Sequence, residues 1–166
     1  MKVNIALLTV TDTRTFDNDK SGSILVDKIK ESNHNLLDRK ICKDNKDEIV
    51  SILKGWIIDE KIDVVITTGG TGLTGRDITP EALDEIADKH IVGFGEIFRN
   101  ISLKTVGTSA IQSRACAVLA NGKYVFALPG SSGGVTDAWE GILKHQLDIN
   151  HKPCNFVELF PRLKEK

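Results

Sequence analysis

The stretch VVITTGGTGLTGRDITPEAL, from Val64 to Leu83, decides the fold. Its first residues are apolar and β-branched, which is typical of a buried strand. Four glycines then follow within seven residues. Thr79-Pro80 marks a helix start, with threonine as the N-cap and proline at the first helical position. The stretch therefore predicts a strand, a long loop and a helix, in that order.

Strand-like and helix-like segments alternate along the rest of the chain. Strands are expected over Val3 to Val10 (VNIALLTV), which suits burial on both faces, and over 36–42, 62–67 and 123–128. Five amphipathic helices are expected. The first runs from Ser21, as N-cap, to about Ser32, and the second follows Asp47-Glu48. The third follows Thr79, with Gly93 just past its end, and the last two span 94–101 and 135–147.

This alternation predicts an α/β fold with a mixed sheet. Strands that alternate with amphipathic helices imply βαβ units and a mainly parallel sheet covered on both faces. Asn121-Gly122 lies between two apolar runs and is a strong hairpin signal, so at least one strand is antiparallel. The tail PCNFVELFPRLKEK contains two prolines and is expected to pack irregularly on the surface.

Length and composition exclude several classes of protein. The chain has 166 residues, which favours one domain over 1–166, and its formal net charge of −1 provides no basic field for nucleic acid or an anionic membrane. No apolar run reaches the roughly 18 residues of a spanning helix, so we expect no membrane partner and a cytoplasmic location. The three cysteines are widely spaced and are expected to be reduced, buried thiols.

Four loops are expected to meet at one edge of the sheet. In a parallel sheet every strand-to-helix loop leaves from the same edge, so the loops at 11–21, 43–47, 68–79 and 129–134 should share one rim. Open α/β sheets bind ligands at that rim. The functional residues are therefore sought there.

The glycine loop matches two known phosphate-binding patterns only in part. Gly70 to Gly75 fits G-x-G-x-x-G, but the helix start at Thr79-Pro80 comes too late for a dinucleotide fingerprint. The same loop misses the P-loop pattern, because Arg76 replaces the lysine and Asp77 replaces the hydroxyl residue. A Rossmann site and a standard NTPase are both disfavoured.

The chemistry of the loop still suits an anion. Glycines let backbone N–H groups approach an anion closely, and Thr67, Thr68, Thr71 and Thr74 add hydroxyl donors. Arg76 offers a charged fork for phosphate, and Asp77 is best explained as a ligand for Mg²⁺ held by phosphates. The alternative is a tight glycine turn in which Asp77 caps the approach to the helix.

Three further parts of the rim could belong to the functional site, and each has an alternative role. Asp47 could join Asp77 at a metal, or it could be an ordinary acid in the first turn of a helix. The loop PGSSGG, from Pro129 to Gly134, could be a second anion pocket or a loose helix entry. Asp12 and Arg14 could serve the site, or they could belong to a solvated loop.

Several motifs in this order resemble the MoaB/MogA family of molybdenum cofactor biosynthesis proteins. They are TTGGTG-LTGRD-ITPEAL (67–83), GFGEIFR (93–99), SRA (Ser113 to Ala115) and ALPGS (Ala127 to Ser131). The resemblance extends from TVTDTRT to the PCNF tail. The length, the GFGEIFR run and the tail look more like the MoaB branch.

The resemblance implies a fold, an assembly, a substrate and a reaction. It implies a three-layer α/β/α fold, assembly as a homotrimer or as a hexamer of two trimers, and molybdopterin binding alongside other enzymes of the cofactor pathway. In active members, molybdopterin phosphate attacks the α-phosphorus of Mg·ATP, giving adenylyl-molybdopterin and pyrophosphate. The family's GGTG loop maps onto Gly69, Gly70, Thr71 and Gly72, its acidic positions onto Asp47 and Asp77, and its PGS loop onto Pro129, Gly130 and Ser131.

The sequence leaves three functions to consider. The first is adenylyl transfer to molybdopterin, and the second is a non-catalytic protein that binds molybdopterin as a scaffold in the same pathway. The third, a nucleotide-binding oxidoreductase, predicts NAD(P) binding.

Overall fold

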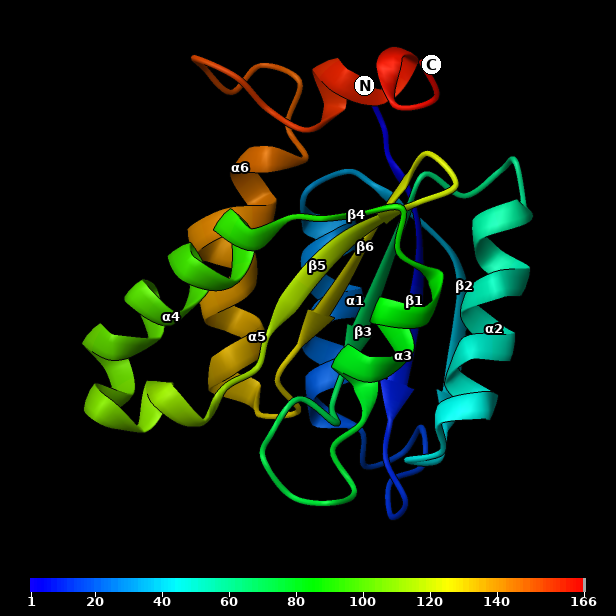
Figure 1. Cartoon of the computed structure of the whole chain (residues 1–166). Coiled ribbons are helices and arrows are strands. Elements are labelled where there is room, and N and C mark those ends of the chain that lie inside the picture. The colour runs from blue at the N-terminus through cyan, green and yellow to red at the C-terminus, as the bar shows by residue number, and fades with distance from the viewer. Residues whose placement is uncertain (166) are drawn as a thin grey trace.

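A mixed sheet runs through the centre of the computed structural model, which describes residues 1–165 (Figure 1). Its six strands lie in the order β2-β1-β3-β6-β5-β4. Neighbours among β2, β1, β3 and β6 are parallel, whereas β5 is antiparallel to both β6 and β4. The predicted mostly parallel, mixed sheet is confirmed. The strands are β1 (Asn4–Val10), β2 (Asn35–Cys42), β3 (Val64–Thr68), β4 (Lys89–His90), β5 (Cys116–Ala120) and β6 (Lys123–Leu128).

Helices cover both faces of this sheet, which gives the three-layer α/β/α arrangement (Figure 1). The helices α1, α4 and α5 pack on one face, and α2 and α3 pack together on the other. No helix in residues 1–165 is both long enough and apolar enough to cross a membrane. The helical segments are α1 (Lys20–Glu31), α2 (Lys46–Ile58), α3 (Thr79–Ile86), α4 (Val92–Val106), η1 (Gly107–Gln112), α5 (Ser132–Ala138), η2 (Trp139–Leu143), α6 (Lys144–Gln146) and η3 (Val157–Arg162).

The strand β1 shows why its sequence is apolar at nearly every position. Ile5 and Leu7 pack into the core beneath α1, α4 and α5, whereas Ala6 and Leu8 pack into the core beneath α2 and α3. All four side chains are fully buried. Because successive residues of a strand point to opposite faces, a central strand of a three-layer fold needs apolar residues on both.

Two predicted helix caps are wrong. The N-cap of α1 is Asp19 rather than Ser21, and its carboxylate accepts a hydrogen bond from the Gly22 amide at 3.0 Å. The helix α3 begins at Thr79, but its N-cap is Ile78. The Thr79 hydroxyl donates instead to the Gly69 carbonyl at 2.8 Å, so it braces the glycine loop.

Two predictions about segment ends are also corrected. Gly93 does not follow α3 but lies in the first turn of α4, because the short strand β4 intervenes. The tail forms η3 instead of an irregular surface segment, and Val157 within it is buried. The Phe156 ring lies 4.6 Å from that of Tyr124, centroid to centroid.

The strand register brings the predicted rim together. Thr68 at the end of β3 pairs with Thr9 near the end of β1 and with Leu128 at the end of β6. Parallel strands that end level release their loops at one edge, and Figure 1 shows the glycine loop there. The N-terminus and η3 lie at the opposite edge.

Candidate functional site

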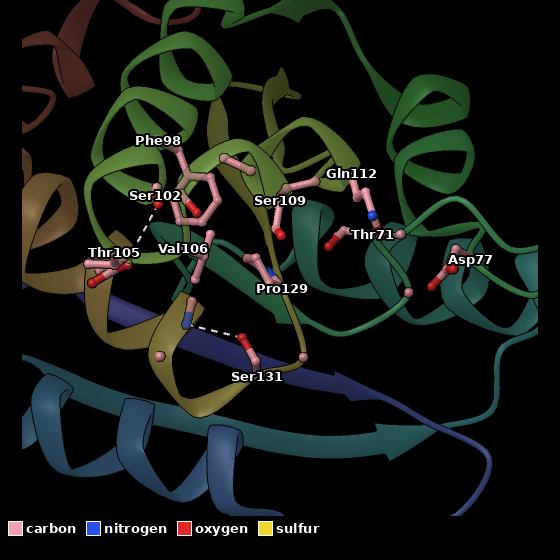
Figure 2. Close-up of a pocket in the computed structure, with 18 residues that line it drawn as sticks. Thr71, Asp77, Phe98, Ser102, Thr105, Val106, Ser109, Gln112, Pro129 and Ser131 are labelled. Carbon is pink, nitrogen blue, oxygen red and sulfur yellow. Dashed lines mark hydrogen bonds between the residues drawn. The ribbon is translucent and has the colours of Figure 1, made fainter.

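A cavity of about 730 Å³ opens at the carboxyl ends of β3 and β6. Figure 2 shows its walls, which come from the glycine loop after β3, from the loop after β6, and from α4 with η1. Segments far apart in the sequence therefore build one site. Its lining residues are Gly70, Thr71, Gly72, Asp77, Phe98, Ser102, Thr105, Val106, Ser109, Ala110, Gln112, Ser113, Pro129, Gly130, Ser131, Gly133, Gly134 and Asp137.

The glycine loop requires glycine at its first two positions. Gly69 and Gly70 have φ angles of 101° and 67°, in the left-handed region that side chains disfavour. A Cβ atom on Gly69 would also lie 2.2 Å from the Val10 carbonyl oxygen. The Gly69 amide donates to the Leu128 carbonyl at 3.0 Å, which fixes the loop to β6. Bare main chain thus forms this wall, and a ligand can approach it closely.

Asp77 faces the cavity as an ionised carboxylate. Its Oδ2 accepts hydrogen bonds from the amide of Thr74 at 2.9 Å and from its hydroxyl at 2.8 Å. Burial raises the pKa of Asp77, but these hydrogen bonds, the Gly72 amide and the charge of Arg114 outweigh it, so the pKa lies below its usual value. Asp77 therefore closes a turn within the glycine loop by bonding Thr74. It does not cap α3, because the N-cap of that helix is Ile78 and no side chain bonds there.

The second acid at the rim is Asp44, which the sequence analysis did not single out. Asp47 lies in the first turn of α2, where it is exposed, and it is not a lining residue. Asp44 precedes that helix and is half-buried. It does not line the cavity either, but its Oδ1 lies 3.3 Å from where a Cβ atom on Gly70 would be. The pKa of Asp44 is raised, first by burial and second by the negative charge of Asp77, which disfavours a second negative charge nearby. A signal was present, because Asp44 lies two residues after the end of β2, within a predicted rim loop.

Asp12 and Arg76 reach the rim but pair with each other. Their side chains form a salt bridge, and the Asp12 Oδ1 accepts a hydrogen bond from the Asp44 amide at 3.2 Å. The Arg76 side chain is 73% exposed and does not line the cavity. These two residues therefore link three loops, and the guanidinium of Arg76 is not positioned as a phosphate fork inside the cavity.

The threonine hydroxyl groups in and near the glycine loop have different roles. Thr71 lines the cavity, whereas Thr68 donates its hydroxyl to the Pro129 carbonyl at 2.7 Å and braces the loop after β6. The Thr67 side chain is fully buried, away from the rim. Arg14 adds a second brace, because its Nη1 donates to the Gly130 carbonyl at 3.0 Å. Only some of the predicted donors can contact a ligand.

The sequence left open whether the loop after β6 is a second anion pocket or a loose helix entry. Pro129, Gly130 and Ser131 line the cavity. Ser131 is also the N-cap of α5, since its hydroxyl oxygen accepts a hydrogen bond from the Gly134 amide at 3.1 Å (Figure 2). The loop is therefore a cavity wall and a capped helix entry at once.

Sequence reasoning missed the wall formed by α4 and η1. Polar side chains recur there at helical spacing and face the cavity, namely Ser102, Thr105, Ser109 and Gln112 (Figure 2). The Thr105 hydroxyl donates to Asp137 Oδ2 at 2.9 Å. The available signal was the spacing of three or four residues between these uncharged polar side chains, which continues from α4 into η1.

The acids fit a divalent cation that shares its ligands with a phosphate. Residues 1–165 contain no group of three or more His, Cys, Asp or Glu side chains that could hold a metal alone. Asp44 Oδ1 and Asp77 Oδ2 both lie against the glycine loop, 3.3 Å and 2.7 Å from where Cβ atoms on Gly70 and Gly72 would be, and a cation held there would offset the two negative charges. Mg²⁺ is commonly bound by one or two carboxylates plus phosphate oxygens. With the bare glycine loop, this arrangement suits a polyanionic ligand.

Comparison with known proteins identifies the family. Residues 6–149 match the family described as "Probable molybdopterin binding domain". Molybdenum cofactor biosynthesis protein B of Escherichia coli K12 is 44% identical over 161 residues, covering 97% of this chain and 93% of that protein. The Bacillus cereus protein of the same name is 44% identical over 147 residues, covering 88% of this chain and 87% of that protein.

Solved structures agree. A crystal structure of a molybdenum cofactor biosynthesis protein B has a TM-score of 0.89 at 39% identity, covering 100% of this chain and 98% of that chain. The tungsten cofactor synthesizing protein MoaB from Pyrococcus furiosus has a TM-score of 0.78 at 35% identity, covering 87% of this chain and 92% of that chain. Together with the glycine-loop cavity, these matches show that the chain belongs to the MoaB/MogA family of molybdenum cofactor biosynthesis proteins, in its MoaB branch.

Proposed function

We propose that this protein binds molybdopterin and transfers an adenylyl group to it from Mg·ATP. A phosphate oxygen of molybdopterin forms a bond to the α-phosphorus of ATP. The bond from that phosphorus to the oxygen bridging to the β-phosphate breaks, and pyrophosphate leaves. The observation that carries the proposal is a cavity lined by a bare glycine loop and the Asp77 carboxylate, with Asp44 beside Gly70 of that loop, in a molybdopterin-binding family.

The residues of this chain would act by positioning and by balancing charge. The main chain of Gly70 to Gly72 holds phosphate oxygens, and Asp44 and Asp77 hold the cation that neutralises them. Phosphoryl-type transfer needs in-line placement more than a covalent nucleophile. The polar side chains on α4 and η1 are placed to hydrogen-bond a pterin ring, and a cavity of about 730 Å³ is of a size that accommodates such ligands.

The first prediction concerns the two carboxylates. Asp77→Asn and Asp44→Asn should each reduce turnover at least about 100-fold, because phosphoryl charge would be poorly neutralised. The measurement is incorporation of radiolabelled AMP into molybdopterin in the presence of Mg·ATP. Asp47→Asn is the matched control and should keep nearly full activity, since Asp47 is exposed, whereas Asp44 is half-buried and lies beside Gly70. A fully active Asp77→Asn variant would remove Asp77 from the mechanism.

A non-catalytic molybdopterin-binding role is the second candidate. Among the residues that the structure describes, no Lys, Arg or His lines the cavity. A triphosphate therefore depends on main chain, uncharged polar side chains and metal, with no cationic side chain, which favours a scaffold over an ATP-using enzyme. The same assay separates the two, because a scaffold binds molybdopterin without consuming ATP.

We also propose that the protein assembles as a homotrimer or a hexamer, in the cytoplasm, beside other enzymes of the cofactor pathway. The helix α4 supports self-association because it leaves Val92, Ile97 and Leu103 exposed. Apolar side chains exposed in this way are available for burial against another chain. A light-scattering mass equal to one chain would remove the assembly from the proposal.

A further inference from the structure

Arg114 bridges the two ends of the glycine loop. It lies between η1 and β5, and its amide donates to the Thr71 carbonyl at 2.8 Å. Its Nε donates to the Gly72 carbonyl at 2.6 Å, and its Nη2 donates to the Asp77 carbonyl at 2.7 Å. One side chain therefore holds both ends of the segment 72–77.

The charge of Arg114 is balanced by Glu81 in the first turn of α3. The Arg114 Nη1 pairs with Glu81 Oε1, and its Nη2 lies 3.3 Å from Glu81 Oε2. The hydrogen bond from Arg114 lowers the pKa of Glu81, so the pair stays ionised at neutral pH. Only arginine has the flat fork that serves a carboxylate and two carbonyls together. With its donors engaged in this way, the guanidinium is a brace for the loop.

The hydrogen bonds also orient the main chain of the loop. The carbonyls of Gly72 and Asp77 point towards the guanidinium. Because a trans peptide is planar, the amides of Leu73 and Ile78 point the opposite way. Two carbonyl oxygens that would repel a polyanion are thereby occupied. Gly72 and Asp77 line the cavity, whereas Arg114 does not.

We propose that Arg114 is a positioning residue, which holds the glycine loop and the Asp77 carboxylate in the geometry that binds the phosphates without touching the ligand. This inference rests on the proposed function, since it concerns the same cavity. It differs from the expectation for Arg76, whose guanidinium pairs with Asp12 instead of the loop carbonyls.

Arg114→Lys tests the proposal in the full-length protein, because lysine keeps the charge but loses the fork. Calorimetry with Mg·ATP should show about tenfold weaker binding or more, as expected for losing charge-assisted hydrogen bonds. Amide hydrogen exchange without ligand should be faster in the peptide covering residues 72–78. If Arg114 only supported folding, the variant would have a lower melting temperature, but hydrogen exchange in this peptide and the affinity for ATP would not both change.

Arg99→Lys is the matched control. Arg99 on α4 also donates to backbone carbonyls, those of Ser113 at 3.3 Å and Ala115 at 3.0 Å, beside Arg114 in the chain. It makes no hydrogen bond to the glycine loop in residues 1–165. We expect a comparable loss of melting temperature with unchanged exchange in the loop peptide.

Glu81→Gln gives a graded test, because glutamine keeps one acceptor for the fork but removes the charge. Its ATP affinity should fall between those of wild type and Arg114→Lys. Wild-type affinity and loop exchange in Arg114→Lys would overturn the inference and leave the proposed function standing. A wild-type protein that binds neither ATP nor molybdopterin would overturn both, and ATP binding without turnover would overturn only the adenylyl transfer.

Discussion

At the scale of single residues, burial separates side chains that look alike in the sequence. Thr67 and Thr68 are neighbours on β3, but the Thr68 hydroxyl donates to the Pro129 carbonyl. The Thr67 hydroxyl has no hydrogen-bond partner in residues 1–165 and lies between Leu8 and Ala127 on the adjacent strands. A buried hydroxyl without a partner is a net cost to stability.

Thr67→Val should therefore leave the free energy of unfolding unchanged or raise it by about 1 kcal/mol, because a methyl group replaces an unpaired polar atom. Urea unfolding followed by circular dichroism provides the measurement. Thr68→Val should instead lower the free energy by about 1 kcal/mol, since it leaves the Pro129 carbonyl without its donor. A loss of equal size in both variants would show that Thr67 has a partner after all.

The two acids before and within α2 show why the site could be predicted only in part. Asp44 and Asp47 both belong to a rim loop or its helix, and chain position alone does not separate them. Their difference arises from the turn between β2 and α2, which tucks Asp44 inwards and leaves Asp47 exposed. The glycine loop could be predicted because its residues are contiguous, whereas the α4–η1 wall depends on packing between distant segments.

At the scale of elements, short sequence motifs predict the structure correctly where it depends on the local backbone conformation. The Asn121-Gly122 hairpin was predicted correctly, and both residues have positive φ angles, 50° and 73°, as its tight turn requires. The strand β4 was not predicted, because two residues carry no periodic pattern. The cap of α1 was misassigned because the helix begins at Lys20, so that Asp19 and not Ser21 bonds the Gly22 amide. The cap of α3 was misassigned because the Thr79 hydroxyl donates to the Gly69 carbonyl, outside the helix.

Asp19 joins α1 to the first two strands. Its Oδ2 accepts from the Thr9 hydroxyl at 2.6 Å and from Arg39 Nη2 at 2.9 Å. Burial raises its pKa, but the bonds from Thr9, Gly22 and Arg39 outweigh this, so the pKa of Asp19 is lowered. A carboxyl with a lowered pKa stabilises the fold fully above its unfolded pKa of about 3.9, and this is lost as pH falls through the folded pKa.

Asp19→Asn should consequently lower the free energy of unfolding at pH 7 by about 1–3 kcal/mol, because Arg39 loses its charged partner. The difference from wild type should shrink as the pH falls below about 4, when the wild-type carboxyl itself becomes protonated. Urea titrations at several pH values test this. Asp27→Asn, exposed on the same helix, is the control and should show neither effect. A difference that stays constant down to pH 2 would contradict the role given to the charge.

At the scale of the whole molecule, the C-terminal segment completes one of the two cores. The Phe156 ring lies 5.9 Å from Phe126 and 4.6 Å from Tyr124, centroid to centroid. The Tyr124 hydroxyl donates to the Phe156 carbonyl at 3.1 Å. The prolines suggested an irregular tail, because sequence patterns describe neighbours along the chain and not aromatic packing against a distant strand.

Phe156→Ala should lower the free energy of unfolding by about 2–3 kcal/mol, since it removes a partly buried ring from this cluster. Leu159→Ala in the same segment should change it by less than about 0.5 kcal/mol, because Leu159 is 45% exposed. Thermal and urea unfolding of both variants give the comparison. Equal effects would mean that the segment contributes as a whole and not through this ring.

The placement of the chain ends has a practical consequence. The N-terminus and η3 lie at the edge of the sheet away from the glycine loop (Figure 1). An affinity handle or a fused reporter domain attached at either end would therefore extend away from the mouth of the cavity. Immobilised protein should accept ligand as readily as free protein does, which allows binding to be followed on a sensor surface.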